Sequence, residues 1–222
     1  MTWVKICGIT NLEDALVAVD AGADALGFVF YEKSPRKVDS ERAREIVDKL
    51  PKHVEKVGVF VDQSAEQIET IARMANLTAI QVYGVGDSAR LKTLRRQGSI
   101  LRFILAVPGD RLDGDSVFLG LGNRNGWIDA ILLDSTSATA PGGTGKKFDW
   151  SATQGWARAI NSIVPVIVAG GLTPENVGEA IEAFRSYGVD VSSGVEAKLG
   201  KKDPKKVRTF VQAVREADRN GG

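Results

Sequence analysis

The sequence has few of the residues on which many catalytic and structural sites depend. Its 222 residues include one cysteine, Cys7, and one histidine, His53. A single cysteine excludes an internal disulfide and fits a reducing compartment. A single histidine nearly excludes histidine-based triads and histidine-rich metal sites. These two absences remove large classes of site from consideration.

Charge and hydropathy exclude further classes of protein. Lysine and arginine number 29 against 28 aspartates and glutamates, so the net charge is +1 and does not favour nucleic acid or a membrane surface. No apolar run approaches the length of a membrane span. Residues 1–10 lack the basic start, apolar run and cleavage site of a signal peptide. We therefore expect a cytoplasmic protein with no nucleic-acid or membrane partner.

What the sequence contains is one repeated unit, a short apolar run rich in β-branched residues followed by an amphipathic helix. The expected strands are residues 3–7, 25–30, 57–61, 79–82, 100–107, 128–134, 166–169 and 189–193. Eight strands, each followed by a helical stretch, predict a single parallel eight-stranded (β/α)8 TIM barrel over residues 1–222. The alternative is a doubly wound open sheet, which usually has a glycine fingerprint after its first strand, where this chain has CGIT.

Capping residues predict where several helices start. Thr10 and Glu13 have the spacing of a capping box before the first helix. Thr173 is expected to cap the helix after the seventh strand, and Pro204 suits the first turn of the last helix. Glycines are dense across residues 108–126, which predicts an irregular or short fifth helix.

Cys7 and Asp134 end the first and sixth predicted strands, where a barrel places its functional residues. Strand alternation puts Lys5 on the same face as Cys7, and Leu132 on the same face as Asp134. If both faces point inward, a thiol and a carboxyl meet across the mouth, which suits proton transfer. The plainer alternatives are a buried structural cysteine and a loop-capping aspartate.

The turns after the seventh and eighth strands have the composition of a phosphate site. Gly170 and Gly171 let the backbone approach a ligand, because glycine lacks a β-carbon. Ser192, Ser193 and Gly194 supply hydroxyls and amides, and they are expected to open a short extra helix whose N-terminus favours an anion. Barrels commonly bind phosphate at this position. The alternative is that these glycines only make tight turns.

Two other loops contain residues that suggest a functional role. Arg36 follows the second strand, and its guanidinium suits a two-pronged grip on a planar carboxylate, although a solvated basic loop is the default interpretation. Residues 141–150 resemble a P-loop only superficially, because they lack the Gly-Lys-Ser/Thr ending and follow no strand directly. A lid over the mouth is the better interpretation of that loop.

Taken together, these residues resemble the phosphoribosylanthranilate isomerase family of tryptophan biosynthesis. The motifs occur in the family's order: VKICGIT, GFVF before SPR, VGVFVD, LLDS, GGTGKKFDW, AGGLTPENV and VDVSSGVE. The resemblance implies a (β/α)8 barrel without cofactor or metal. It also implies an Amadori rearrangement of N-(5-phosphoribosyl)anthranilate to 1-(2-carboxyphenylamino)-1-deoxyribulose 5-phosphate.

The resemblance also assigns the acid and the base. Asp134 is the acid that protonates the furanose oxygen, so a raised pKa is expected for it. Cys7 is the base that takes the proton from the second carbon as a thiolate, and Lys5 is a candidate to stabilise that thiolate.

By the same resemblance, substrate contacts fall to Lys5, Arg36, Gln81 and Asp190, with Arg36 on the anthranilate carboxylate. Phosphate contacts fall to Gly170, Gly171, Ser192, Ser193 and Gly194. One position departs from the family, because Tyr83 stands where the family usually has histidine. A tyrosine keeps a hydrogen-bonding tip but does not take up a proton near neutral pH.

Three competing functions stay open at this point. Lys5 as a Schiff-base amine would make the barrel a lyase or aldolase. A dual isomerase for histidine and tryptophan synthesis is a second rival. By resemblance, such an enzyme would have two aspartates at its site, whereas here the first strand ends in Cys7. The third is a phosphosugar-binding barrel without catalysis. The expected partner is a phosphorylated small molecule, and the chain is expected to be a monomer or homodimer.

Overall fold

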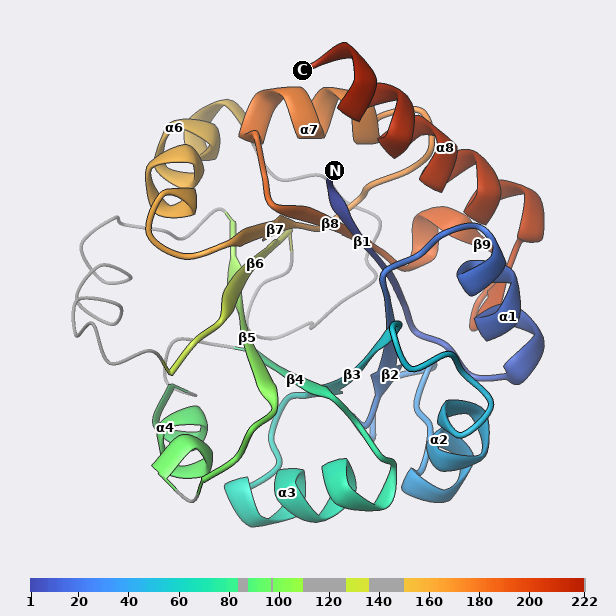
Figure 1. The fold of residues 1–222 in the computed structure, drawn as a ribbon, viewed down its shortest axis with the longest axis vertical. Coiled ribbons are helices and arrows are strands. Elements are labelled where there is room, and N and C mark those ends of the chain that lie inside the picture. Colours follow the sequence, from blue (N-terminus) through green and yellow to red (C-terminus); the bar gives the residue numbers. More distant parts are fainter. Residues whose placement is uncertain (84–87, 97, 110–126, 136–149, 222) are drawn as a thin grey trace.

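The structure, a computed structural model, describes residues 1–83, 88–96, 98–109, 127–135 and 150–221. Eight parallel strands close into a barrel in the order β1 to β8, so the predicted fold class is confirmed (Figure 1). The strands are β1 Trp3–Cys7, β2 Ala25–Val29, β3 Glu55–Phe60, β4 Ala79–Tyr83, β5 Arg102–Pro108, β6 Ala130–Asp134, β7 Val166–Val168 and β8 Gly188–Val191.

Helices surround the barrel, and α8 lies between α1 and α7 so that the two ends of the chain close the ring (Figure 1). The helices are α1 Leu12–Asp20, α2 Ser40–Val47, α3 Ala65–Met74, α4 Ser88–Arg96, α6 Trp150–Asn161, α7 Val177–Phe184 and α8 Pro204–Asn220. After β8 come a 3-10 turn, η2 Ser193–Val195, and a hairpin of β9 Glu196–Lys198 with β10 Lys201–Lys202. The predicted irregular fifth helix falls mainly on residues 110–126, which lie outside the described residues.

Strand alternation divides the buried side chains into two layers. Residues such as Val4 and Ile6 point outward into the large core between strands and helices. The barrel interior is a smaller cluster of Ala25, Val57, Ala79, Ile104, Ala106, Ala130, Leu132, Ile167 and Ala169. Because five of these nine are alanine, the interior leaves room for longer polar side chains. Lys5, Gln81 and Asp190 are all buried.

Two of the predicted caps are wrong. Helix α1 is capped by Asn11, whose side chain accepts from the backbone N–H of Asp14, while the Thr10 hydroxyl donates to the carbonyl of Gly200. Thr10 is therefore committed to a tertiary contact that local spacing does not reveal. Helix α7 begins at Val177, after a turn over residues 174–176, so Thr173 precedes the helix by more than a cap position.

The start of α8 is as predicted. Asp203 caps it by accepting from the backbone N–H groups of Lys205 and Lys206, and Pro204 occupies the first turn. Helix α3 carries a full capping box, in which Ser64 and Gln67 each accept from the other's backbone N–H. Both residues of this box are exposed, and neither lines the cavity at the barrel mouth.

Ser64→Ala is expected to lower the free energy of unfolding by about 1 kcal/mol, because one exposed donor of the first turn loses its partner. Ser64→Asp should restore most of the loss, since aspartate caps equally well. Chemical denaturation measures both changes. A loss of several kcal/mol in Ser64→Ala would show that the residue has a structural role beyond capping.

Candidate active site

The carboxyl ends of the strands surround one cavity, and both sequence-predicted acid–base residues line it. Cys7 ends β1 and Asp134 ends β6, and their side chains are nearly buried. Tyr83 at the end of β4 and Asp190 in β8 line the same cavity. The predicted inward faces of strands one and six are therefore the ones that the barrel adopts, and the two residues share one mouth.

The Cys7 thiol lies against a buried ion pair. Lys5, fully buried on the same strand, places its ammonium 2.9 Å from the carboxylate of Asp190. Gly27 on the neighbouring strand makes the room, because a β-carbon there would lie 2.7 Å from the Cys7 sulfur and 3.1 Å from Cε of Lys5. The lysine stem and the thiol thus occupy space that any other residue at position 27 would fill.

The pKa values of Lys5 and Cys7 are both raised, for different reasons. Burial works against the Lys5 ammonium, but the carboxylate of Asp190 and the neighbouring Cys7 outweigh it, so the pKa of Lys5 is raised. Burial raises the pKa of the Cys7 thiol, and the Lys5 ammonium offsets only part of that rise. Lys5 is therefore a permanent cation beside a thiol whose thiolate it stabilises.

The carboxyl of Asp134 has a specific partner, since the Tyr83 hydroxyl donates to Oδ2 of Asp134 at 3.0 Å. Burial and the adjacent negative charge of Asp134 raise the pKa of Tyr83 well above its usual value. The phenol therefore stays protonated and remains a donor across the neutral range. Tyr83 thus gives Asp134 a hydrogen-bond donor that does not titrate near neutral pH.

The predicted phosphate turns meet at the cavity wall, where Gly170, Gly171, Ser192, Ser193 and Gly194 all line the opening. Gly170 and Gly171 have φ values of 81° and 66°, in the left-handed region that favours glycine. A β-carbon on Gly194 would lie 1.9 Å from the carbonyl oxygen of Leu172, so only glycine lets the η2 turn pack against the loop after β7. Backbone and hydroxyl groups from two loops are thereby presented together.

Arg36 lines the same cavity but is already engaged. Its Nε and Nη2 atoms donate to both carboxylate oxygens of Glu196, at 2.7 and 2.8 Å. The hydrogen bonds and charge of Glu196 raise the pKa of Arg36 despite partial burial. The two-pronged grip predicted for a ligand carboxylate is therefore made to a protein carboxylate instead, and the default interpretation of a solvated loop is wrong for Arg36, because its side chain is buried.

Two predicted substrate-binding residues lie beneath the mouth instead of on its surface. Lys5 and Gln81 are both 0% exposed and do not line the cavity. The side-chain amide of Gln81 points into the barrel with no hydrogen-bond partner among the described residues. Direct substrate contact by either residue stays a prediction, and the structure places Lys5 where it acts on Cys7 and Asp190.

Sequence reasoning missed Gly27, Glu196 in its pairing role, and Lys202. Glu196 lies in the quoted motif VDVSSGVE, so its carboxylate next to the phosphate turn was the one available signal. The predicted lid over residues 141–150 falls almost entirely outside the described residues. Within the described ranges no cluster of three or more His, Cys, Asp or Glu side chains could hold a metal, and no helix is long and apolar enough to cross a membrane.

Comparison with known proteins gives a consistent result along almost the whole chain. The family model described as N-(5'phosphoribosyl)anthranilate (PRA) isomerase matches residues 4–213. A protein of Pseudomonas aeruginosa (strain LESB58) named N-(5'-phosphoribosyl)anthranilate isomerase is 44% identical over 218 residues, which cover 98% of this chain and 97% of that protein.

Solved structures agree with the sequence matches. A phosphoribosyl anthranilate isomerase in complex with reduced 1-(o-carboxyphenylamino)-1-deoxyribulose 5-phosphate superimposes with a TM-score of 0.80 at 38% identity. A structure of monomers of the dimeric enzyme from Thermotoga maritima gives the same TM-score and identity. Each comparison covers 97% of this chain and 100% of the other.

Replacing the buried lysine gives a test of the electrostatics around the thiol. Lys5→Met is expected to move the titration of Cys7 to higher pH, because removing the ammonium leaves burial and Asp190, both of which raise the thiol pKa. Since Cys7 is the one cysteine in the chain, its thiolate absorbance reports this group alone among thiols. Lys49→Met, at an exposed lysine, should leave the midpoint unchanged. An unshifted midpoint in Lys5→Met would contradict the assignment.

Proposed function

The chain belongs to the N-(5'-phosphoribosyl)anthranilate (PRA) isomerase family, an enzyme family of tryptophan biosynthesis, and from this we propose that its barrel mouth catalyses the Amadori rearrangement of phosphoribosylanthranilate by acid–base chemistry. The observation that carries the mechanism is the placement of Cys7 and Asp134 on one cavity, at the ends of β1 and β6.

In the proposed first step Asp134 donates a proton to the furanose oxygen. The C1–O bond breaks, the nitrogen lone pair forms a C=N bond to C1, and Asp134 becomes a carboxylate. The Tyr83 hydroxyl, 3.0 Å from Oδ2, stabilises the charge that Asp134 gains. Tyr83 therefore acts in this mechanism as a hydrogen-bond donor and not as a proton carrier.

In the proposed second step Cys7 removes the proton from the second carbon. The electron pair of that C–H bond moves toward the iminium and gives an enolamine, which becomes the 1-amino-2-keto product by proton shifts. A buried thiolate needs a compensating positive charge, and the Lys5 ammonium supplies part of it, while burial still raises the pKa of the thiol. Proton removal and proton donation are thus assigned to opposite sides of one mouth.

Binding in this proposal uses the two ends of the substrate. The phosphate is held by the turns that contain Gly170, Gly171, Ser192, Ser193 and Gly194. The anthranilate carboxylate is held by Arg36, through the guanidinium nitrogen that Glu196 leaves unbound. The reduced product analogue bound to a relative carries both groups, which supports an assignment of two anionic ends.

The same geometry disfavours Lys5 as a Schiff-base amine. A nucleophilic lysine must lose its proton, whereas Asp190 and Cys7 raise the pKa of Lys5 in spite of its burial. Lys5 also does not line the cavity, so a carbonyl substrate does not reach it in this arrangement.

We further propose a cytoplasmic enzyme that works as a monomer or homodimer. The one thiol suits a reducing compartment. All of the assigned site residues come from a single chain, so the proposed chemistry does not require a partner subunit. A related structure is described as that of a dimeric enzyme, which supports the homodimer as the alternative to a monomer.

Cys7→Ser and Asp134→Asn are each expected to reduce kcat by about 10²–10⁴-fold, because each removes one proton-transfer group. The loss of phosphoribosylanthranilate fluorescence measures turnover, with the substrate generated in situ. Asp20→Asn, an exposed aspartate on α1, is the matched control and should retain full activity. Near-normal turnover in either active-site variant would overturn the role assigned to that residue.

The wild-type assay separates the competing functions. Tight binding of the reduced product analogue without any turnover would identify a phosphosugar-binding barrel instead of an enzyme. Turnover of the corresponding histidine-pathway substrate would identify a dual isomerase. We expect turnover of phosphoribosylanthranilate and no turnover of the histidine-pathway substrate.

A further inference from the structure

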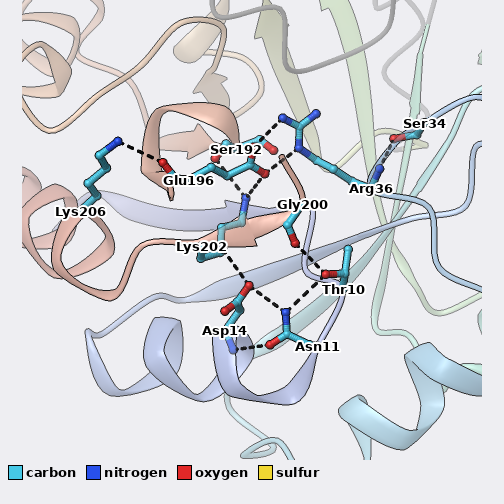
Figure 2. A network of polar contacts seen from close by, with 10 residues as sticks. All are labelled: Thr10, Asn11, Asp14, Ser34, Arg36, Ser192, Glu196, Gly200, Lys202 and Lys206. Carbon is cyan, nitrogen blue, oxygen red and sulfur yellow. Dashed lines mark hydrogen bonds and ion pairs between the residues drawn. The ribbon is translucent and has the colours of Figure 1, made fainter. Parts of the chain in front are cut away.

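Arg36 and Glu196 form a buried, two-pronged ion pair that joins two distant parts of the chain. Arg36 lies in the loop after β2, and Glu196 begins β9 just beyond the η2 turn. Their side chains are only 7% and 6% exposed. Figure 2 shows the third guanidinium nitrogen of Arg36 pointing away from Glu196. Because Arg36 lines the cavity and Glu196 does not, the pair holds the guanidinium from behind.

A second buried cation connects this pair to the phosphate turn. Lys202, 1% exposed in β10, donates to Oε1 of Glu196 and to the backbone carbonyl of Ser192, both at 3.1 Å (Figure 2). Its own backbone N–H donates to the carboxylate of Asp14 on α1 at 2.8 Å. One ammonium therefore fixes the carboxylate behind Arg36 and the main chain of the predicted phosphate site.

The aliphatic part of the Arg36 side chain lies close to the predicted phosphate turn. A β-carbon on Gly8 would lie 2.5 Å from Cδ of Arg36 and 3.0 Å from Oγ of Ser192. Gly8 has a φ of 77°, so this position is left without a side chain and Arg36 passes over it beside Ser192. The arginine and the phosphate turn share one small region at the end of β1.

The side chains of Arg36 and Lys202 both bind the carboxylate of Glu196, so these three side chains together carry one positive charge in excess. Burial opposes the charge on Glu196, but the hydrogen bonds from Arg36 and the charge of Lys202 lower its pKa, so Glu196 stays ionised at neutral pH. An unpaired buried cation is costly, so Arg36 and Lys202 both depend on the Glu196 carboxylate for compensation. The remaining positive charge is available to an anionic ligand at the mouth.

We propose that Glu196 is a positioning residue that fixes Arg36 at a set distance from the phosphate turn, so that the site selects ligands whose carboxylate and phosphate are correctly separated. Lys202 completes this link through Ser192. The inference rests on the proposed function, because it takes the substrate to carry both anionic groups. Glu196 acts through Arg36 and does not itself contact the ligand.

The experiment compares two ligands on one protein. The first is reduced 1-(o-carboxyphenylamino)-1-deoxyribulose 5-phosphate, and the second is the 1-phenylamino analogue that lacks only the carboxylate. Calorimetric titration gives a Kd for each, and the ratio of the two reports how well Arg36 is used. Because both values come from the same sample, the ratio does not depend on how much of the protein is folded.

In the wild type the carboxylate should tighten binding by about 10- to 100-fold, the usual range for a charged hydrogen bond. Glu196→Gln should reduce this ratio by about tenfold, while the Kd of the analogue without carboxylate changes by less than about threefold, because the amide no longer fixes both guanidinium nitrogens. Glu32→Gln is the matched control: Glu32 pairs with Lys37 at the surface of the same loop and does not contact Arg36. It should leave the ratio unchanged.

An unchanged or larger ratio in Glu196→Gln would overturn the inference, since it would show that Glu196 only competes with the ligand for Arg36. An equal weakening of both ligands would also overturn it, because that pattern indicates a general structural role. Glu196→Asp keeps the charge but shortens the reach, and it should lower the ratio as well if Glu196→Gln does not fold. Failure of the proposed function looks different, because wild type would then neither turn over the substrate nor favour the carboxylated ligand.

Discussion

The ion pair between Lys5 and Asp190 is the constraint on which the centre of this barrel depends. Enclosing a lysine among strands costs several kcal/mol in desolvation unless a carboxylate compensates it, and removing either partner leaves an uncompensated charge. Here Nζ of Lys5 lies 2.9 Å from Oδ1 of Asp190, and the lysine is fully buried. The same pair acts on Cys7, because the Lys5 ammonium lowers the pKa of the thiol and the Asp190 carboxylate raises it.

This arrangement requires small residues elsewhere in the barrel. Five of the nine apolar interior residues are alanine, and Gly27 leaves open the volume that the Cys7 sulfur and the Lys5 stem fill. A barrel packed with larger side chains would gain apolar contacts but would have no place for the ion pair. The small residues of the barrel interior are therefore what makes room for the ion pair and for the Cys7 thiol.

The sequence predicts the parts of this site that depend on periodicity. Alternation along β1 places Lys5 and Cys7 on one face, and the end of the sixth strand places Asp134 at the mouth, because both follow from backbone geometry. The pairing of Arg36 with Glu196 joins residues 160 positions apart, and no local pattern encodes it. Local spacing predicts that Thr10 caps α1, and this prediction is wrong for the same reason, since the Thr10 hydroxyl donates to the carbonyl of Gly200 across the fold.

Each of the two proposed proton-transfer groups is held by a partner that keeps its own proton. The pKa of Lys5 beside Cys7 and the pKa of Tyr83 beside Asp134 are both raised, so neither partner titrates near neutral pH. A histidine in place of Tyr83 would titrate in that range and would add a third mobile proton to the mouth. With tyrosine there, the proposed proton transfers involve only Cys7 and Asp134. The tyrosine at position 83 is thus compatible with the proposed mechanism.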